Sequence, residues 1–134
     1  MKPLPFTVIR ENGLVHVDAK VDAAFRQALM DGIPVQLRGK MREALAATPN
    51  KGAMAHSRRY FGDELPHIKN RIAPLVIELN RFLSESRGLP GLFDWLDVTN
   101  FGNDYRMIKA FAAWAETKGM PSLGVVPPKA LVSG

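Results

Sequence analysis

Residues 63–87 read DELPHIKNRIAPLVIELNRFLSESR, and this stretch decides the fold. Its apolar residues recur at alternating steps of three and four, the spacing of a helix that lies with one side on a core. They are Leu65, Ile68, Ile72, Leu75, Leu79 and Phe82. Lys69 belongs to the polar side and is expected to face water. Asp63 is placed to cap the helix, and Gly88 is placed to end it in a left-handed conformation. Pro74 removes one backbone donor, so we expect a kink there or two helices in succession.

The composition is that of a soluble globular protein. The chain has 134 residues, of which 46% are hydrophobic and 23% charged, enough for one domain with its own core. No apolar run approaches the roughly 20 residues that cross a bilayer, and Met1–Pro5 lacks the apolar core of a signal peptide. We therefore expect synthesis in a cytoplasm and no contact with a membrane. Without cysteine, disulfides and thiol chemistry are excluded.

The net charge of +5 is concentrated in the middle of the chain. From Leu37 to Arg81 there are nine Lys or Arg and four Asp or Glu, and the remainder balances. The expected basic surface consists of Arg38, Lys40, Arg42, Arg58 and Arg59. Such a surface suits nucleic acid or an acidic protein. A solvated face that aids solubility explains the same charges equally well.

Two β-prone runs, Phe6–Arg10 and Leu14–Val17, flank a turn that ends in Asn12-Gly13. An Asn-Gly pair accepts the positive φ angles of a type I′ turn, so a β-hairpin is predicted over residues 1–17. Because two strands alone are only marginally stable, the hairpin must pack on its own domain or extend a sheet in a partner.

Helical patterns fill residues 18–118, so the predicted fold class is mainly α, a compact domain of four or five helices with a short N-terminal β-hairpin over residues 1–118. Pro34 is expected to begin the second helix, and Asn50–Gly62 is expected to be a loop. Residues 119–134 contain three Pro and three Gly without a helical period. They predict an extended C-terminal arm that lies in a groove of this domain or of a neighbour, or that frays.

Residues 95–116 read WLDVTNFGNDYRMIKAFAAWAE, which predicts two short helices joined by a tight turn. Gly102 allows the turn, Asn103 is placed to cap the second helix, and Asp104 complements its dipole. The stretch resembles the C-terminal helix-loop-helix of tailed-phage capsid scaffolding proteins, in which an apolar-Asp pair precedes a Gly-Leu-Gly-Asn turn. The matching residues are Leu96, Asp97, Gly102, Asn103, Met107, Ile108, Phe111 and Ala112, whereas Asn100 and Phe101 replace the usual glycine and leucine.

Scaffolding proteins of that family are long, acidic and rich in coiled coil, so the resemblance implies a related structural use rather than a literal scaffold. It implies a bacteriophage virion protein, a small capsid- or head-associated protein that serves in assembly, as a minor capsid component or as decoration. The expected partner is the capsid or another head protein. The expected contact residues are Phe101, Gly102, Asn103, Tyr105, Arg106 and Met107. Phe101 is predicted to be the exposed anchor at the tip of the turn, while Phe111 is predicted to be core.

No catalytic, metal or cofactor pattern is evident. The three histidines are scattered along the chain, and no pair has the helical spacing of a zinc site. We therefore expect no enzymatic activity and no cofactor. The alternative function is a small basic nucleic-acid-binding protein that uses the Arg/Lys-rich segment 37–81. Homo-oligomerisation stays open, as does contact between the basic segment and nucleic acid within a virion.

Overall fold

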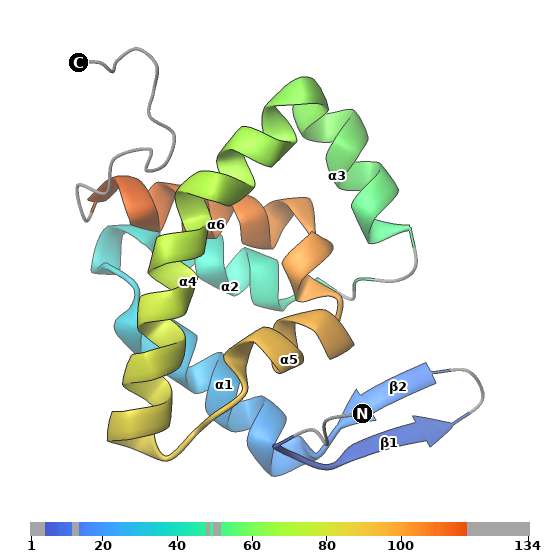
Figure 1. The fold of residues 1–134 in the computed structure, drawn as a ribbon, viewed down its shortest axis with the longest axis vertical. Coiled ribbons are helices and arrows are strands. Elements are labelled where there is room, and N and C mark those ends of the chain that lie inside the picture. Colours follow the sequence, from blue (N-terminus) through green and yellow to red (C-terminus); the bar gives the residue numbers. More distant parts are fainter. Residues whose placement is uncertain (1–4, 12–13, 48, 50–51, 118–134) are drawn as a thin grey trace.

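Helices make up most of the chain, and a two-stranded β-hairpin precedes them (Figure 1). The computed structural model describes residues 5–11, 14–47, 49 and 52–117, so the predicted arm at 119–134 lies outside the described residues. The α-helices are α1 (Ala19–Gly32), α2 (Arg38–Leu45), α3 (Ala53–Phe61), α4 (Leu65–Arg87), α5 (Leu92–Val98) and α6 (Tyr105–Thr117). The short 3-10 segments are η1 (Val35–Leu37), η2 (Gly62–Glu64) and η3 (Phe101–Asn103). The predicted mainly helical fold is confirmed.

The N-terminal β-hairpin forms as predicted. Strands β1 (Val8–Glu11) and β2 (Leu14–Val17) pair antiparallel with Val8 opposite Val17. β2 lies against α1 and α5, so the hairpin packs on its own domain. Asp18 then caps α1, because its carboxylate accepts the backbone N–H of Lys20 at 3.1 Å.

α4 is a single helix that runs through Pro74, so of the two expected outcomes, a kink or a short helix followed by a longer one, the second is wrong. Gly88 ends α4 in the left-handed conformation at φ 61°, as predicted. The predicted cap is wrong, because Asp63 lies in η2 and Glu64 occupies the N-cap position without a side-chain hydrogen bond. Phe82 also departs from the predicted core side of this helix, since 49% of its surface is exposed.

Two other local predictions are corrected. Residues 53–61 form α3 instead of a loop, and Ser57 on this helix is completely buried. The Ser57 hydroxyl donates to the Asn103 carbonyl at 2.5 Å, while Met54 and Phe61 of α3 pack against the core. Pro34 precedes η1 rather than an α-helix, and α2 begins only at Arg38.

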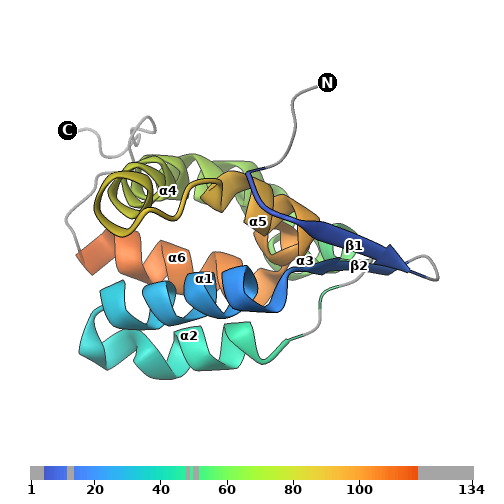
Figure 2. The ribbon, with the colours of Figure 1, turned by 90° about the horizontal axis from the view of Figure 1, so that it is seen from below.

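α6, rather than α4, is the central helix of the domain. It packs against α4 on one side and against α2 on the other (Figure 2). Its buried residues are Met107, Ile108, Ala110, Phe111, Trp114 and Ala115. Asp104, rather than Asn103, caps it, because its carboxylate accepts the Arg106 N–H at 2.8 Å.

A stack of aromatic rings joins α1 to the helical hairpin, the name used here for α5, η3 and α6 together. The Trp95 ring lies 5.2 Å from the ring of Phe25 and 5.2 Å from that of Phe101. The Trp95 indole N–H donates to the Asp22 carboxylate at 2.9 Å, which satisfies the polar atom of a buried ring. Arg26 pairs with the same carboxylate at 2.7 Å. These contacts fix the helical hairpin against α1.

Candidate functional site

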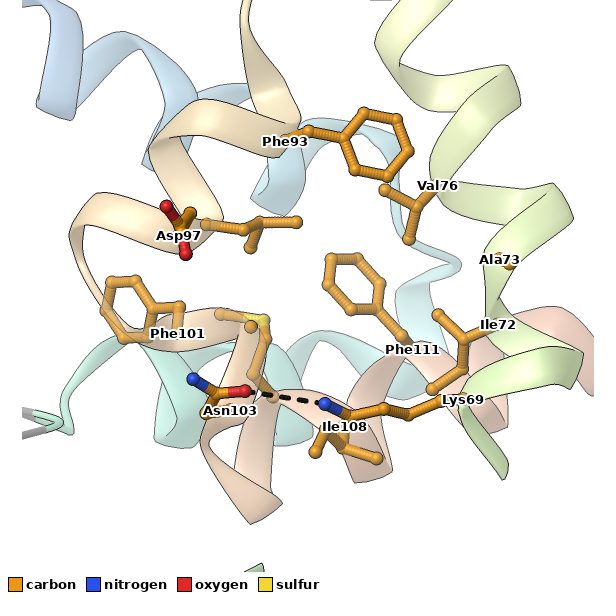
Figure 3. Close-up of a pocket in the computed structure, with 13 residues that line it drawn as sticks. Lys69, Ile72, Ala73, Val76, Phe93, Asp97, Phe101, Asn103, Ile108 and Phe111 are labelled. Atoms are coloured by element: carbon orange, nitrogen blue, oxygen red, sulfur yellow. Dashed lines mark hydrogen bonds between the residues drawn. The ribbon is translucent and has the colours of Figure 1, made fainter. Parts of the chain in front are cut away.

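An apolar groove opens between α4 and the helical hairpin (Figure 3). Its volume is about 280 Å³, and side chains from α4, α5, η3 and α6 all contribute to its walls. The lining residues are Lys69, Ile72, Ala73, Val76, Phe93, Leu96, Asp97, Phe101, Gly102, Asn103, Met107, Ile108 and Phe111. We call this cavity the hairpin groove. Grooves of this kind accept an apolar side chain and are the usual form of a protein or ligand contact.

Phe93 stands at the edge of the hairpin groove and is 48% exposed. Figure 3 shows it beside Val76, so one side of the ring faces the groove. A large aromatic residue that is half exposed next to an apolar cavity is favourably placed for contact with a partner, because binding would remove its remaining surface from water.

Charged groups stand on opposite sides of the hairpin groove, with Lys69 on α4 and Asp97 on α5 (Figure 3). The Lys69 ammonium donates to the Asn103 side-chain oxygen at 3.4 Å. Burial, and then the nearby Arg58 guanidinium, lowers the pKa of Lys69 from its usual value of 10.5. Within the part of the chain that the structure describes, no carboxylate pairs with Lys69. A carboxylate on a partner would offset the repulsion between the Lys69 ammonium and the Arg58 guanidinium.

The structure overturns the expectation that Phe101 is an exposed anchor. Phe101 is 1% exposed and Met107 is completely buried, so neither presents a free side chain to a partner. The reason is that the turn folds back onto α1, where the Arg26 guanidinium lies 5.3 Å from the Phe101 ring centre. Phe111 is 3% exposed, which confirms its predicted place in the core.

The other four predicted contact residues divide between two surfaces. Gly102 and Asn103 are half-buried and line the hairpin groove. Tyr105 and Arg106 are also half-buried, but they line shallow cavities beside α3. The predicted site is therefore not one continuous patch.

The predicted basic residues lie on α2 and α3. Lys40, Arg42, Arg58 and Arg59 are exposed, whereas Arg38 is half-buried. The Arg38 Nε atom is buried and has no hydrogen-bond partner among the described residues. Arg58 lies near Lys69, while Arg59 borders a cavity with Tyr105. The predicted basic residues therefore have different neighbours and do not form one continuous stripe.

No local pattern in the sequence singles out Phe93 or Lys69 as part of the groove. Phe93 precedes the stretch that carries the resemblance, and Lys69 is expected from the sequence to face water. The positions of Phe93 and Lys69 in the groove depend on how α5 lies against α4. The Asn80 side chain on α4 fixes this arrangement, because it accepts the Leu92 backbone N–H at 3.1 Å. A tertiary contact of this kind leaves no local signal in a sequence.

Among the described residues, no group of three or more His, Asp or Glu side chains lies close enough to hold a metal ion. In the same part of the chain, none of the helices has the length and apolar character to cross a membrane. Comparison with known proteins found no matching family model, no matching curated protein and no matching solved structure.

Proposed function

We propose that this chain is a small structural protein of a bacteriophage virion, associated with the capsid or head, which binds the shell through its helical hairpin. The proposal begins from the resemblance of residues 95–116 to the helix-loop-helix of capsid scaffolding proteins. In this chain those residues form α5, η3 and α6, and the turn between the helices lines the hairpin groove. A binding role of this kind needs no catalysis and no cofactor.

The observation that carries the proposal is the hairpin groove with the half-exposed Phe93 at its edge. We expect a segment of the shell protein to place an apolar side chain in the groove and cover the Phe93 ring. Lys69, which lines the groove on the side opposite Asp97 and pairs with no carboxylate among the described residues, favours a carboxylate next to that apolar side chain. The partner is therefore expected to present an apolar residue and an acidic residue close together.

The test compares Phe93→Ala with Phe82→Ala. Both phenylalanines are half exposed, at 48% and 49%, but only Phe93 lines the hairpin groove. Each variant is co-expressed with the major capsid protein encoded in the same genome, and its amount is measured in purified particles. Phe93→Ala should reduce incorporation about tenfold or more, which corresponds to the loss of about 1.4 kcal/mol or more from an aromatic anchor.

Phe82→Ala should be incorporated like the unmodified chain, and thermal unfolding should show that both variants are folded. Equal incorporation of the two variants would show that the hairpin groove does not contact the shell protein. Absence of the unmodified chain from purified particles would reject the virion role itself.

A further inference from the structure

A second surface, on the α3 side of the molecule, carries stacked aromatic rings. His56 and Tyr60 lie one turn apart on α3, and both contact the ring of Tyr105 at the start of α6. The ring centres of His56 and Tyr105 are 4.7 Å apart with planes 16° from parallel. Those of Tyr60 and Tyr105 are also 4.7 Å apart, with planes 31° from parallel. We call these three residues the ring cluster.

The ring cluster is accessible, unlike the aromatic stack in the core. Tyr60 is 51% exposed, His56 is exposed and Tyr105 is half-buried. Tyr60 also packs edge-on against Phe61, with ring centres 4.8 Å apart, and this contact still leaves half of the Tyr60 surface exposed. A flat, accessible ring is a surface on which a nucleic-acid base can stack, whatever the base.

Cations surround the ring cluster. The Arg106 guanidinium lies 5.0 Å from the Tyr105 ring centre, and the Lys109 ammonium lies 5.3 Å from that of Tyr60. Two shallow cavities of about 330 and 410 Å³ flank the rings, and Arg59 and Lys40 stand at their borders.

Two carboxylates also border these cavities. Asp104 is 7% exposed, and its carboxylate caps α6. Glu43 is exposed and lies in one cavity with two lysines and an arginine. The cations therefore outnumber the accessible acid, and the local field favours a polyanion.

We infer that the ring cluster and its flanking cations bind single-stranded nucleic acid. Bases would stack on the accessible surface of His56 and Tyr60, while Lys40, Arg59, Arg106 and Lys109 contact phosphates. In a duplex the bases are already stacked on one another, so they cannot stack on the rings of this cluster. An acidic peptide would satisfy the cations but would leave the rings without a function, so nucleic acid fits more of the surface.

This surface is separate from the hairpin groove. The two share no lining residue, because the groove is formed by α4 and the inner side of the helical hairpin, whereas the ring cluster lies between α3 and the start of α6. The inference therefore does not rest on the virion proposal, and both contacts can be made at once. Phe93→Ala, which tests the groove, should leave nucleic-acid binding unchanged.

The experiment measures binding of the full chain to fluorescently labelled (dT)12 and (rU)12 by anisotropy over a series of salt concentrations. Tyr60→Ala should weaken binding about 5-fold to 150-fold, the range for loss of one base–aromatic stack. Tyr60→Phe keeps the ring and should bind like the unmodified chain. Phe82→Ala removes a comparably exposed ring outside both cavities and should have no effect.

The cations are tested with matched changes of charge. Arg106→Gln with Lys109→Gln should reduce the slope of log affinity against log salt by about 1.4, since each phosphate contact on a single strand contributes about 0.7. Arg81→Gln with Arg87→Gln removes the same charge from the C-terminal half of α4, away from α3 (Figure 1), and should leave the slope unchanged.

Binding of either oligonucleotide with these effects supports the inference. It is overturned if neither oligonucleotide binds, if duplex DNA binds as tightly as the single strand, or if Tyr60→Ala behaves like Phe82→Ala. Binding of poly-glutamate in preference to both oligonucleotides would also overturn it and would identify an acidic protein as the partner.

Discussion

Replacement of Phe101 by alanine should destabilise the domain strongly. The side chain is 1% exposed, and its ring lies 5.2 Å from that of Trp95 and 5.3 Å from the Arg26 guanidinium. Truncation of a buried phenylalanine costs about 3–5 kcal/mol, and the lost ring pair accounts for about 0.5–1.5 kcal/mol. Because Phe101 also lines the hairpin groove, water can reach part of the vacated space. We therefore expect the lower half of the range, about 3–4 kcal/mol.

This loss is large enough to measure by thermal unfolding. A chain of this size has an unfolding entropy of about 0.28 kcal/mol per kelvin, so the unfolding temperature should fall by roughly 10–15 °C. Phe82→Ala is the control, since a half-exposed ring on α4 should cost about 1 kcal/mol or less. The two variants are compared by circular dichroism in one buffer at equal concentration. A similar unfolding temperature for both would refute the placement of Phe101 in the core.

Two further predictions concern stability. Gly91→Ala should lower the free energy of unfolding in urea clearly more than Gly88→Ala. Both glycines have positive φ angles, but an added Cβ at Gly91 would run into the Pro5 ring, whereas one at Gly88 would meet open space. Gly88→Ala should lose about 1–2 kcal/mol for the left-handed conformation alone, and equal losses would contradict the predicted clash. Lys69→Met should be more stable than the unmodified chain at pH 7, because burial and Arg58 disfavour the charged ammonium in the folded state. The unfolded chain holds the Lys69 proton more tightly than the folded chain, so the stability of the unmodified chain should rise toward pH 10.5. The difference in unfolding free energy between Lys69→Met and the unmodified chain should therefore shrink over the same range. A difference that does not change with pH in urea unfolding would argue against this.

The sequence predicted those parts of the fold that local signals specify. Gly88 ends α4 and the β-hairpin forms because their signals lie within a few residues of the structures that they determine. α3 was missed because its most buried residue, Ser57, is small and polar and finds its partner in Asn103. The apolar spacing of α3 is interrupted at its most buried position, where a hydrogen bond to a distant residue takes the place of apolar packing.

The candidate sites were less predictable than the fold. The sequence of the turn alone predicts an exposed Phe101, but Arg26 on α1 covers the ring. Tyr105 was assigned to the same contact as Phe101, yet its ring lies against His56 on α3. Each of these side chains has neighbours that are remote in the chain, and a single sequence gives no indication of such neighbours.

The hydrogen bond from Trp95 to Asp22 has a consequence for how the protein is made. The two residues are 73 positions apart, and a ribosome adds roughly 5–20 residues per second. Asp22 is therefore incorporated into the chain roughly 4–15 s before Trp95, whose indole covers this helix. During this interval Phe25, which is fully buried in the finished domain, has no Trp95 ring to pack against. Nascent chains stalled before α5 should thus expose Phe25 to chaperones, and completion of α5 should end that exposure.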